Sequence, residues 1–518
     1  MKKTQKVQPK KAQVEKTQAR AARKIENQKA NQDIVEKAKH AKKANERAHR
    51  ESTLSKGEAG RVLDRLILLE KVIPPGEIVQ VLQDTDCLDS RSCTLSFEVL
   101  CWFVLAMGVL PEMSLRNIFK ASRRLPLGKR EATPHRSSLC KGRQRLGIAP
   151  IRLLFERLAV PLAKPHTPGT FYKGWRLLAM DGTVFNVPDS EANANAFGYP
   201  KGGRGAGAFP QVRKLSLVEV GTHAELALVV KGLKEKESGE QSMAPALFRH
   251  LKPSMLLLWD RGFFSYKLWQ EMILRGCQVL ARVKSSLVLR STKELSDGSH
   301  LAKIYPCQSM RNRDEGGIVV RVIRYTHDDP RRVGCGEEHV MVTTLLDEVA
   351  HPVRKLIVMY HERWEIELTF DEQKTHQNPW RVTKPANLRS ETPLGVIQEI
   401  YTLAIGHYVT RSLMSEAAEE KGMDPDRMSF VGCFQILKTR MPECPIDPTK
   451  RERWFKALRN EMSMEVTDPR RNRINPRVIR VKMSKFGKKQ PHHRGISELE
   501  RSFEDVIVPR SPPQSASA

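Results

Sequence analysis

The sequence predicts an α/β protein in which a mixed β-sheet with flanking helices is interrupted by an all-β insertion. Apolar residues recur at helical spacing between residues 60 and 165, which predicts a helical region before the sheet. Up to residue 284, three strand-like runs are followed by strands that alternate with helices, an order typical of a mixed sheet with packed helices. Residues 285–345 hold several strand-like runs without a clear helix.

The chain carries a large positive charge. Its 518 residues include 88 Lys+Arg and 59 Asp+Glu, a net charge of +29. This charge favours a polyanionic partner, above all nucleic acid, although a basic solvated surface is the simpler alternative. Hydrophobic residues make up 40% of the chain, enough for a sizeable core. No stretch approaches the roughly 20 apolar residues that span a bilayer, so we expect no membrane partner.

Nine cysteines are scattered along the chain and form no CxxC pair. Their odd number and their spacing argue against a disulfide framework or a zinc ribbon. The N-terminal stretch MKKTQKVQPKKAQ is basic, but no apolar run follows it as in a secretory signal. We therefore expect a protein of the reducing cytoplasm.

Composition and pattern divide the chain into six expected segments. The first 60 residues hold 17 Lys+Arg against 7 Asp+Glu and no aromatic residue, so this arm has little to bury and is expected to be disordered. The segments are a basic arm at 1–59, a helical N-terminal DNA-binding domain at 60–165, a first sheet part at 170–284, the β insertion at 285–345, a second part at 346–430, and a helical C-terminal region with a basic tail at 431–518.

Within 60–165, the run from Ser137 to Ala163 predicts two helices with a break at Gly147 and Pro150. Lys141, Arg143 and Arg145 precede this break and could rest on a phosphate backbone. In the sheet region the expected strands are 176–180, 213–220, 226–230, 255–259 and 278–283, and the expected helices are 241–251 and 265–275.

Two aspartates each follow an apolar strand. Asp181 ends the run RLLAM and precedes Gly-Thr, and Asp260 ends MLLLW and precedes Arg-Gly. One such aspartate is most simply a turn after a strand. Two of them in one sheet indicate a paired-carboxylate site, and carboxylate oxygens are the ligands that hard divalent ions such as Mg²⁺ prefer.

A long helix is expected from Pro352 to His376. At about 100° per residue, its polar side chains Tyr360, Arg363, Glu367 and Lys374 share an arc of about 60°, and Asp371 is the one other acid on that face. A surface stripe of ion pairs is the simpler explanation. However, the apolar residues around the stripe indicate a buried helix, whose charges need partners such as phosphate or metal.

The spacing Tyr360-x2-Arg363-x3-Glu367-x6-Lys374 resembles the signature of the insertion-sequence-four family of DDE transposases. The resemblance covers roughly residues 60–490 and implies a ribonuclease-H-like catalytic fold at 170–284 and 346–430. Further similar segments are GRQRLGIAPIRLLFERLA at 142–159, FGYP at 197–200, FPQVRKLSLVEVGTHAE at 209–225, LLLWDRGFFS at 256–265, RVKSS at 282–286 and LRSETPLGVIQEIY at 388–401.

The resemblance implies that Asp181, Asp260 and Glu367 are the catalytic carboxylates and hold two Mg²⁺ ions per active site, with Mn²⁺ as a substitute. One ion would activate the attacking water or 3′-hydroxyl, and the other would stabilise the leaving oxygen of an in-line phosphodiester displacement. The residues implied to bind DNA phosphates are Tyr360, Arg363, Lys374 and Arg389.

The β insertion departs from the family pattern. Hairpin-forming relatives place there a tryptophan that stacks on a flipped base, but no Trp occurs between Trp269 and Trp364. The equivalent position is close to His339, whose ring could stack on a base with less area, or could be an ordinary histidine at a strand end. Base stacking at His339 is therefore an open expectation.

The resemblance also implies cut-and-paste movement of an insertion sequence in the bacterial cytoplasm, at the nucleoid. The expected partners are the terminal inverted repeats of the element and target DNA, bound by a homodimer on paired ends. The apolar face of the helices between Thr392 and Arg440 could form the dimer contact, or could be buried within one subunit. Two alternatives are a metal-dependent DNA nuclease of the same fold without strand transfer, and a catalytically retired DNA-binding protein.

Overall fold

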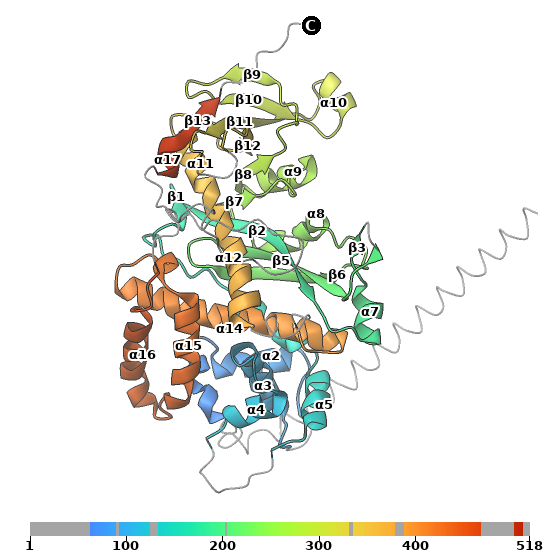
Figure 1. The fold of residues 1–518 in the computed structure, drawn as a ribbon, viewed down its shortest axis with the longest axis vertical. Helices are drawn as coiled ribbons and strands as arrows, with labels where there is room; N and C mark the ends of the chain where they lie inside the picture. Colours follow the sequence, from blue (N-terminus) through green and yellow to red (C-terminus); the bar gives the residue numbers. More distant parts are fainter. Residues whose placement is uncertain are drawn as a thin grey trace, which may run out of the picture.

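The computed structural model describes residues 63–89, 93–124, 133–202, 205–330, 335–378, 388–467 and 502–510. The basic arm at 1–59 and the basic tail at 468–494 lie outside these residues. The described part is elongated (Figure 1): helices occupy one end, a large sheet lies in the middle, and the β insertion forms the other end.

The region before the sheet is helical, as predicted. Helix α3 is apolar on nearly all sides and buried along its length, and it begins at Ser96, whose hydroxyl accepts a hydrogen bond from the Val99 amide. Gly147, with φ +72°, ends α5 at the predicted break. The elements are η3 (Asp64–Lys71), α2 (Pro75–Asp84), α3 (Phe97–Val109), α4 (Leu115–Ala121), α5 (Arg136–Leu146) and α6 (Ala149–Leu158).

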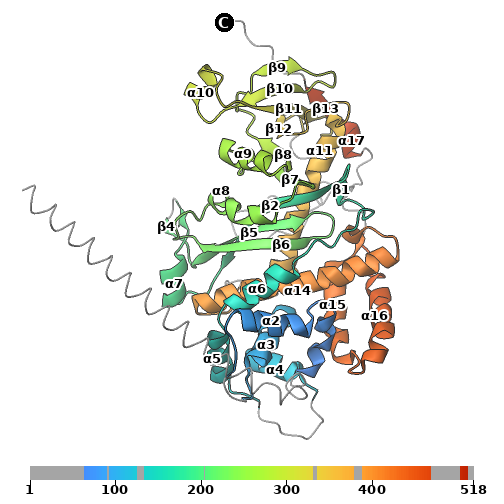
Figure 2. The ribbon, with the colours of Figure 1, turned by 180° about the vertical axis from the view of Figure 1, so that it is seen from behind.

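Helix α14 (Pro393–Glu420) lies between the sheet and the N-terminal helices, as Figures 1 and 2 show. It crosses α3 closely, because a Cβ on Gly108 would stand 2.0 Å from the carbonyl oxygen of Thr402. Helices α15 (Phe430–Arg440) and α16 (Pro448–Met462) join the same hydrophobic core. The apolar face between Thr392 and Arg440 is thus buried within the subunit, and the suggestion that this face forms a dimer contact is wrong.

One mixed sheet runs through the molecule in the order β6-β5-β2-β7-β8-β12-β11-β10-β9. The strands β2, β7 and β8 are parallel, and the other neighbours along this order are antiparallel. The bounds are β2 (Trp175–Asn186), β5 (Gln211–Glu219), β6 (Ala224–Gly232), β7 (Met255–Trp259), β8 (Gln278–Val283), β9 (Ser291–Glu294), β10 (His300–Ile304), β11 (Ile318–His327) and β12 (His339–Thr343). Short strands are β1 (Phe171–Tyr172), β3 (Lys201–Gly202) and β4 (Gly205–Ala206).

The β insertion extends this sheet, because β12 pairs with β8. It also contains one short helix, α10 (Gln308–Asn312), where the sequence predicted none. Helix α10 is five residues long and buries none of them, so it leaves little apolar periodicity to detect. The C-terminal strand β13 (Ile507–Arg510) pairs with β11, and α17 (Phe503–Val506) precedes it.

Helices cover both faces of the sheet. Alternate residues of β2 point to opposite faces. Leu178 therefore packs in one cluster with Trp269 of α9 (Tyr266–Leu274), whereas Leu177 packs in another with Leu356 of α11 (Val353–His361). The elements on the Leu178 side are α8 (Glu240–Met243), η4 (Ala244–His250) and α9 (Tyr266–Leu274). Helix α7 (Glu191–Phe197) lies at the end of the sheet near β6 (Figure 2).

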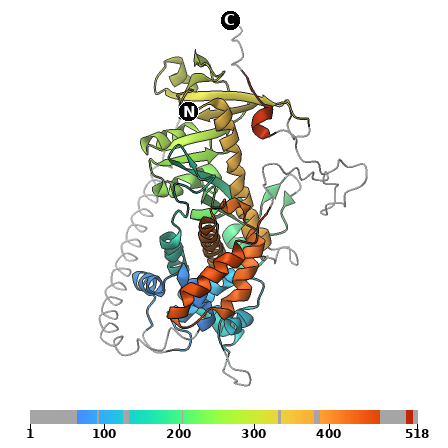
Figure 3. The same ribbon diagram turned by 90° about the vertical axis from the view of Figure 1, so that its left-hand side faces the viewer.

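The predicted helix at 352–376 is a continuous helical stretch with two changes of winding. It consists of α11 (Val353–His361), the 3-10 turn η5 (Glu362–Trp364), α12 (Glu365–Asp371) and the π-helical η6 (Glu372–Gln377). Figure 3 shows this golden stretch running along one face of the green strands. Among the described residues, we find no helix that combines the length and apolar character needed to cross a bilayer.

Candidate active site

Strands β2 and β7 bring Asp181 and Asp260 side by side. In their parallel register Ala179 pairs with Leu258. Asp181 and Asp260, each two residues further on, therefore lie side by side. Asp260 directly follows β7, as predicted. Asp181 does not end its strand, because β5 remains paired with β2 as far as Asn186. The Asp-Gly pair after Met180 is therefore extended strand and not a turn.

The backbone holds both aspartate side chains. The Gly182 amide donates to Oδ1 of Asp181 over 2.8 Å. The Gly262 amide donates to Oδ1 of Asp260 over 2.7 Å. These bonds occupy one oxygen of each carboxylate.

The helical stretch 353–377 turns its polar stripe toward these strands. The Tyr360 hydroxyl donates to the Trp259 carbonyl over 3.1 Å, immediately before Asp260. Near the other end, Lys374 Nζ donates to Thr183 Oγ1 over 3.0 Å and to the carbonyl of Val184. Protein atoms therefore contact both ends of the polar stripe, where the sequence had predicted phosphate or metal as partners.

Arg363 connects the third carboxylate to the site. Its guanidinium lies 3.3 Å from Asp181 Oδ2 and 3.0 Å from Glu367 Oε1, so it bridges the strand and the helix. Asp371, which was expected on the same face, lies one helical turn beyond Glu367 at the end of α12. Its side chain is 51% exposed and pairs with His376.

Burial sets the charge balance of the site. Burial raises the pKa of Asp181 to about 7, although the Gly182 amide and Arg363 oppose this, and the neighbouring carboxylates of Asp260 and Glu240 raise it further. Burial likewise raises the pKa of Tyr360 to about 12. A desolvated carboxylate beside two others binds a cation readily, because the cation removes both the burial cost and the repulsion.

A second charged cluster includes side chains of the helical stretch 353–377. Among the residues that the structure describes, one group of His and acidic side chains brings its ligand atoms within 4.8 Å of one another: His223, Glu365 and Asp426. Glu372, which pairs with His223 Nδ1 over 3.1 Å, also accepts hydrogen bonds from Arg411. His223 is fully buried with φ +57°. This group is an ion-pair network that ties the β5–β6 turn to the helical stretch 353–377.

The network predicts a pH dependence of stability. Burial and Arg411 lower the pKa of His223, but Glu372, Asp426 and Glu365 together raise it to about 10. A raised folded pKa contributes stability that is present below the unfolded value of about 6.5 and is lost as pH rises toward 10. His223→Asn, which tolerates the left-handed conformation, should cost about 3 kcal/mol at pH 6 and less at pH 10.

Chemical denaturation of the wild-type protein and of His223→Asn between pH 6 and pH 10 measures this cost in the free energy of unfolding. The control is His166→Asn, whose side chain is 69% exposed beside Glu419. A cost of His223→Asn that stays constant from pH 6 to pH 10 would contradict a charged His223.

His339 lies in an aromatic cluster of the β insertion, at the start of β12. Its Nδ1 is 2.8 Å from a guanidinium nitrogen of Arg282, and its ring centroid is 5.1 Å from that of Tyr325 and 6.3 Å from that of His327. Burial and the charge of Arg282 lower its pKa. Base stacking at His339 stays a prediction.

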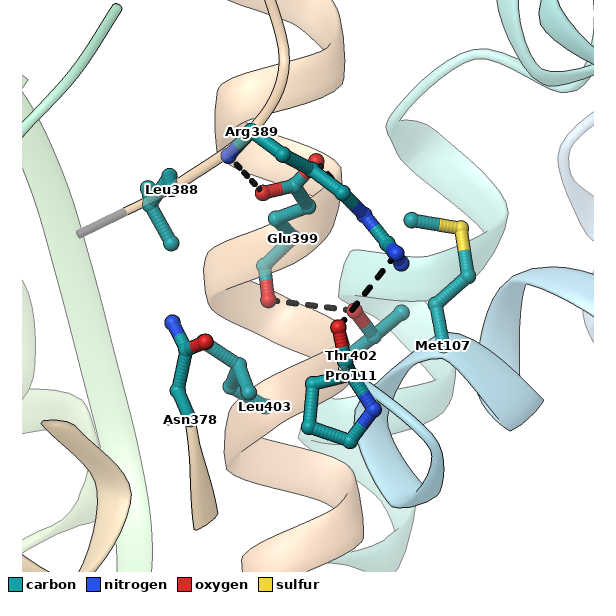
Figure 4. A pocket seen from close by; sticks show the side chains of 8 residues that line it. All are labelled: Met107, Pro111, Asn378, Leu388, Arg389, Glu399, Thr402 and Leu403. Atoms are coloured by element: carbon teal, nitrogen blue, oxygen red, sulfur yellow. Dashed lines mark hydrogen bonds and ion pairs between the residues drawn. The ribbon is translucent and has the colours of Figure 1, made fainter. Parts of the chain in front are cut away.

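Arg389 faces the interior (Figure 4). It donates to the carbonyl of Met113 over 2.6 Å and lies 3.6 Å from Glu399, which lines the same small pocket between α14 and the end of α3. Arg143 of the N-terminal region is also buried and donates to Gln398 and to the Gly395 carbonyl. Both arginines have interior partners in the structure. The phosphate contacts proposed below therefore do not include them.

Sequence reasoning missed two residues near the site. Trp364 follows Arg363 and is 52% exposed, and its ring lies 5.2 Å from the Arg363 guanidinium carbon. The signal that could have pointed to it is its position in the sequence between Arg363 and Glu367. Glu240 begins α8, and its charge contributes to the raised pKa of Asp181. Gly182, the residue after Asp181, is the signal that could have pointed to the close approach of Glu240 to β2.

Two family models match the chain. One, described as insertion element 4 transposase N-terminal, matches residues 63–156, and the other, described as transposase DDE domain, matches residues 173–405. The second match contains Asp181, Asp260 and Glu367.

Two proteins of Escherichia coli (strain K12) are similar to the chain. "Transposase InsG for insertion sequence element IS4" is 25% identical over 429 residues, which cover 81% of this chain and 93% of the relative. "Putative transposase InsZ" is 26% identical over 143 residues, 27% of this chain and 47% of that protein. The two adjoining family matches and the similarity along most of InsG show that the chain belongs to the insertion element 4 family of DDE transposases.

Proposed function

We propose that this transposase moves an insertion sequence by cut and paste, cleaving at the element ends and joining their 3′-hydroxyls to target DNA. The observation that carries the proposal is that Asp181, on β2, is linked to two carboxylates from other elements. Asp181 of β2 lies beside Asp260 after β7, and Arg363 links Asp181 to Glu367 on α12. One such site can serve cleavage and joining, because both are in-line displacements at phosphorus.

The donor set fits a hard divalent cation. Asp181, Asp260 and Glu367 offer carboxylate oxygens, which Mg²⁺ and Mn²⁺ prefer. Burial and like charges raise the pKa of Asp181 although Arg363 opposes the rise, and a bound cation would offset both causes. We propose that these residues hold two ions, which would activate the attacking oxygen and stabilise the leaving oxygen.

The neighbouring residues of the chain have separate parts in this proposal. Tyr360 is 5% exposed, and its hydroxyl holds the backbone just before Asp260, so it positions that carboxylate. Arg363 keeps Asp181 and Glu367 together and offers a planar fork to a phosphate of the transferred strand. Lys374, whose Nζ donates to Thr183 of β2, adds a point charge near the same DNA strand.

DNA binding is proposed for the helical segment 60–165 together with the basic ends of the chain. Lys141 is exposed on α5, whereas Arg145 pairs with Asp89 and lies 4.7 Å from the ring centroid of Phe97. We propose that two protomers hold two element ends, because joining both ends to one target requires two active sites. Their contact lies elsewhere than the buried face of α14.

Incubation of the full-length protein with element-end DNA, a target plasmid and Mg²⁺ tests the proposal. A transposase yields cleaved ends and joined products, and neither forms with a chelator. Cleaved ends that never join, including ends supplied pre-cut, would instead establish a nuclease. End binding without any cleavage in Mg²⁺ or Mn²⁺ would establish a retired DNA-binding protein.

A further inference from the structure

Three buried polar side chains lie between the sheet and the end of the helical stretch 353–377. They are Lys214 of β5, Glu225 of β6 and Gln373 of the π-helical η6, and each is at most 1% exposed or listed as fully enclosed by its side chain. Lys214 Nζ donates to Gln373 Oε1 over 2.6 Å and pairs with Glu225 over 2.8 Å, and Gln373 Nε2 donates to Glu225 Oε2 over 2.9 Å. We call these three residues the buried triad, because each of them contacts both of the others.

The buried triad lies on the face of the sheet to which Asp181 of the candidate site belongs. In the antiparallel register of β2 and β5, Lys214 is directly opposite Thr183, and Ser216 is directly opposite Asp181. Residues that are directly opposite in an antiparallel pair project from the same face of a sheet. Ser216 also donates a hydrogen bond to Glu225. The triad is therefore built into the strand next to β2, beside the candidate site.

Gln373 directly precedes Lys374, the residue proposed to place a charge near the DNA strand. Lys374 Nζ donates over 3.0 Å to Oγ1 of Thr183, which is the cross-strand partner of Lys214. Two consecutive residues of η6 thus contact two paired positions of neighbouring strands. The buried triad fixes the first of these residues, and the second is the one that reaches β2.

The chemistry of the triad suits positioning better than stabilisation. A buried ion pair adds little net stability, because the cost of removing two charges from water offsets their attraction. Its hydrogen bonds are directional, and a satisfied buried network specifies one arrangement of the segments that form it. The segment in question is a π-helical turn, a form that is rare and frequent at functional sites.

We propose that the buried triad positions Lys374 for a DNA phosphate, by fixing the π-helical turn η6 against β5. This inference rests on the proposed phosphate contact of Lys374 and makes Gln373 a positioning residue. Gln373→Met keeps the length of the side chain and removes its hydrogen bonds, while Lys214 and Glu225 remain paired with each other.

The salt dependence of element-end binding measures the phosphate contact. We expect Lys374→Ala to lower the slope of log K against log[salt] by about 0.9, the amount that one neutralised phosphate adds. Gln373→Met should lower the slope in the same direction, by up to about 0.9, although it removes no charge. Gln373→Asn keeps the amide on a shorter side chain, and this milder second variant should lower the slope as well.

A double mutant tests whether Gln373 acts through Lys374. Gln373→Met should lower the slope no further in a Lys374→Ala background, as expected of coupled residues. Mobility shifts of the full-length protein over a salt series give the slopes, and thermal unfolding shows that each variant is folded. Loss of a merely structural contact lowers the melting temperature without changing the number of phosphates neutralised.

Gln377 provides the matched control on the same turn. Its side chain is fully buried, and its Nε2 donates to the carbonyls of Gly108 and Leu403, on α3 and α14, instead of to the sheet. Gln377→Met should therefore lower the melting temperature and keep the wild-type slope.

The outcomes separate this inference from the proposed phosphate contact. A lower slope in both Gln373 variants that is lost in the Lys374→Ala background, with Gln377→Met at the wild-type slope, supports the inference. A wild-type slope in the Gln373 variants, or an equal fall in the Lys374→Ala background or in Gln377→Met, overturns the inference and leaves the Lys374 contact intact. A wild-type slope in Lys374→Ala would overturn the phosphate contact and the inference with it.

Discussion

Replacing Asp181, Asp260 or Glu367 by alanine is expected to abolish both cleavage and strand transfer while element-end binding persists. Each change removes carboxylate oxygens from the proposed metal site, and metal stabilisation of several kcal/mol corresponds to a loss of at least about 1000-fold in rate. Gel assays with end DNA measure the rate, and mobility shifts measure binding.

The control for the helix carboxylate is Asp371→Ala. Asp371 lies one helical turn beyond Glu367 and its side chain is 51% exposed, so this variant should keep wild-type activity. Retained strand transfer in Glu367→Ala, with Asp371→Ala inactive, would show that the wrong carboxylate has been assigned.

Arg363→Lys is expected to reduce strand transfer about 100-fold although the charge is kept, a loss typical of removing one preorganised donor. The planar fork of Arg363 reaches Asp181 and Glu367 at the same time. Lysine offers a compact point charge that cannot repeat this geometry. Joining of pre-cut ends, at matched DNA binding and thermal stability, isolates this effect from end recognition.

Arg354→Lys provides the comparison for Arg363. Arg354 lies on the same helical stretch, in α11, but its guanidinium donates to the Glu504 carbonyl away from the site. This change should leave joining unaltered. Wild-type joining by Arg363→Lys would remove the bidentate role of the arginine.

Local patterns predicted the strands and the helical stretch that carry the residues of the candidate site. Apolar runs before Asp181 and Asp260 marked the two strands, and helical spacing brought Tyr360, Arg363 and Lys374 to one face. The 3-10 turn and the π-helical end of this stretch are changes of winding that residue periodicity does not record.

Contacts between distant segments could not be predicted. Arg143 and Arg389 look like surface cations in sequence, yet each binds partners more than 240 residues away. The approach of α3 to α14 depends on Gly108, and that of Glu240 to β2 on Gly182. In each case the partner is specified only by the packed fold. Exposed or buried status is likewise a tertiary property that charge alone does not determine.

The central claim is that one carboxylate site with divalent metal both cuts and joins DNA. The most direct measurement is the joining of pre-cut ends to a target by wild-type protein and by Glu367→Gln, at equal end binding. We predict that the wild-type protein joins ends in Mg²⁺ and not with a chelator, and that Glu367→Gln joins none. Joining by Glu367→Gln at the wild-type rate, or by the wild-type protein without divalent metal, would contradict the claim.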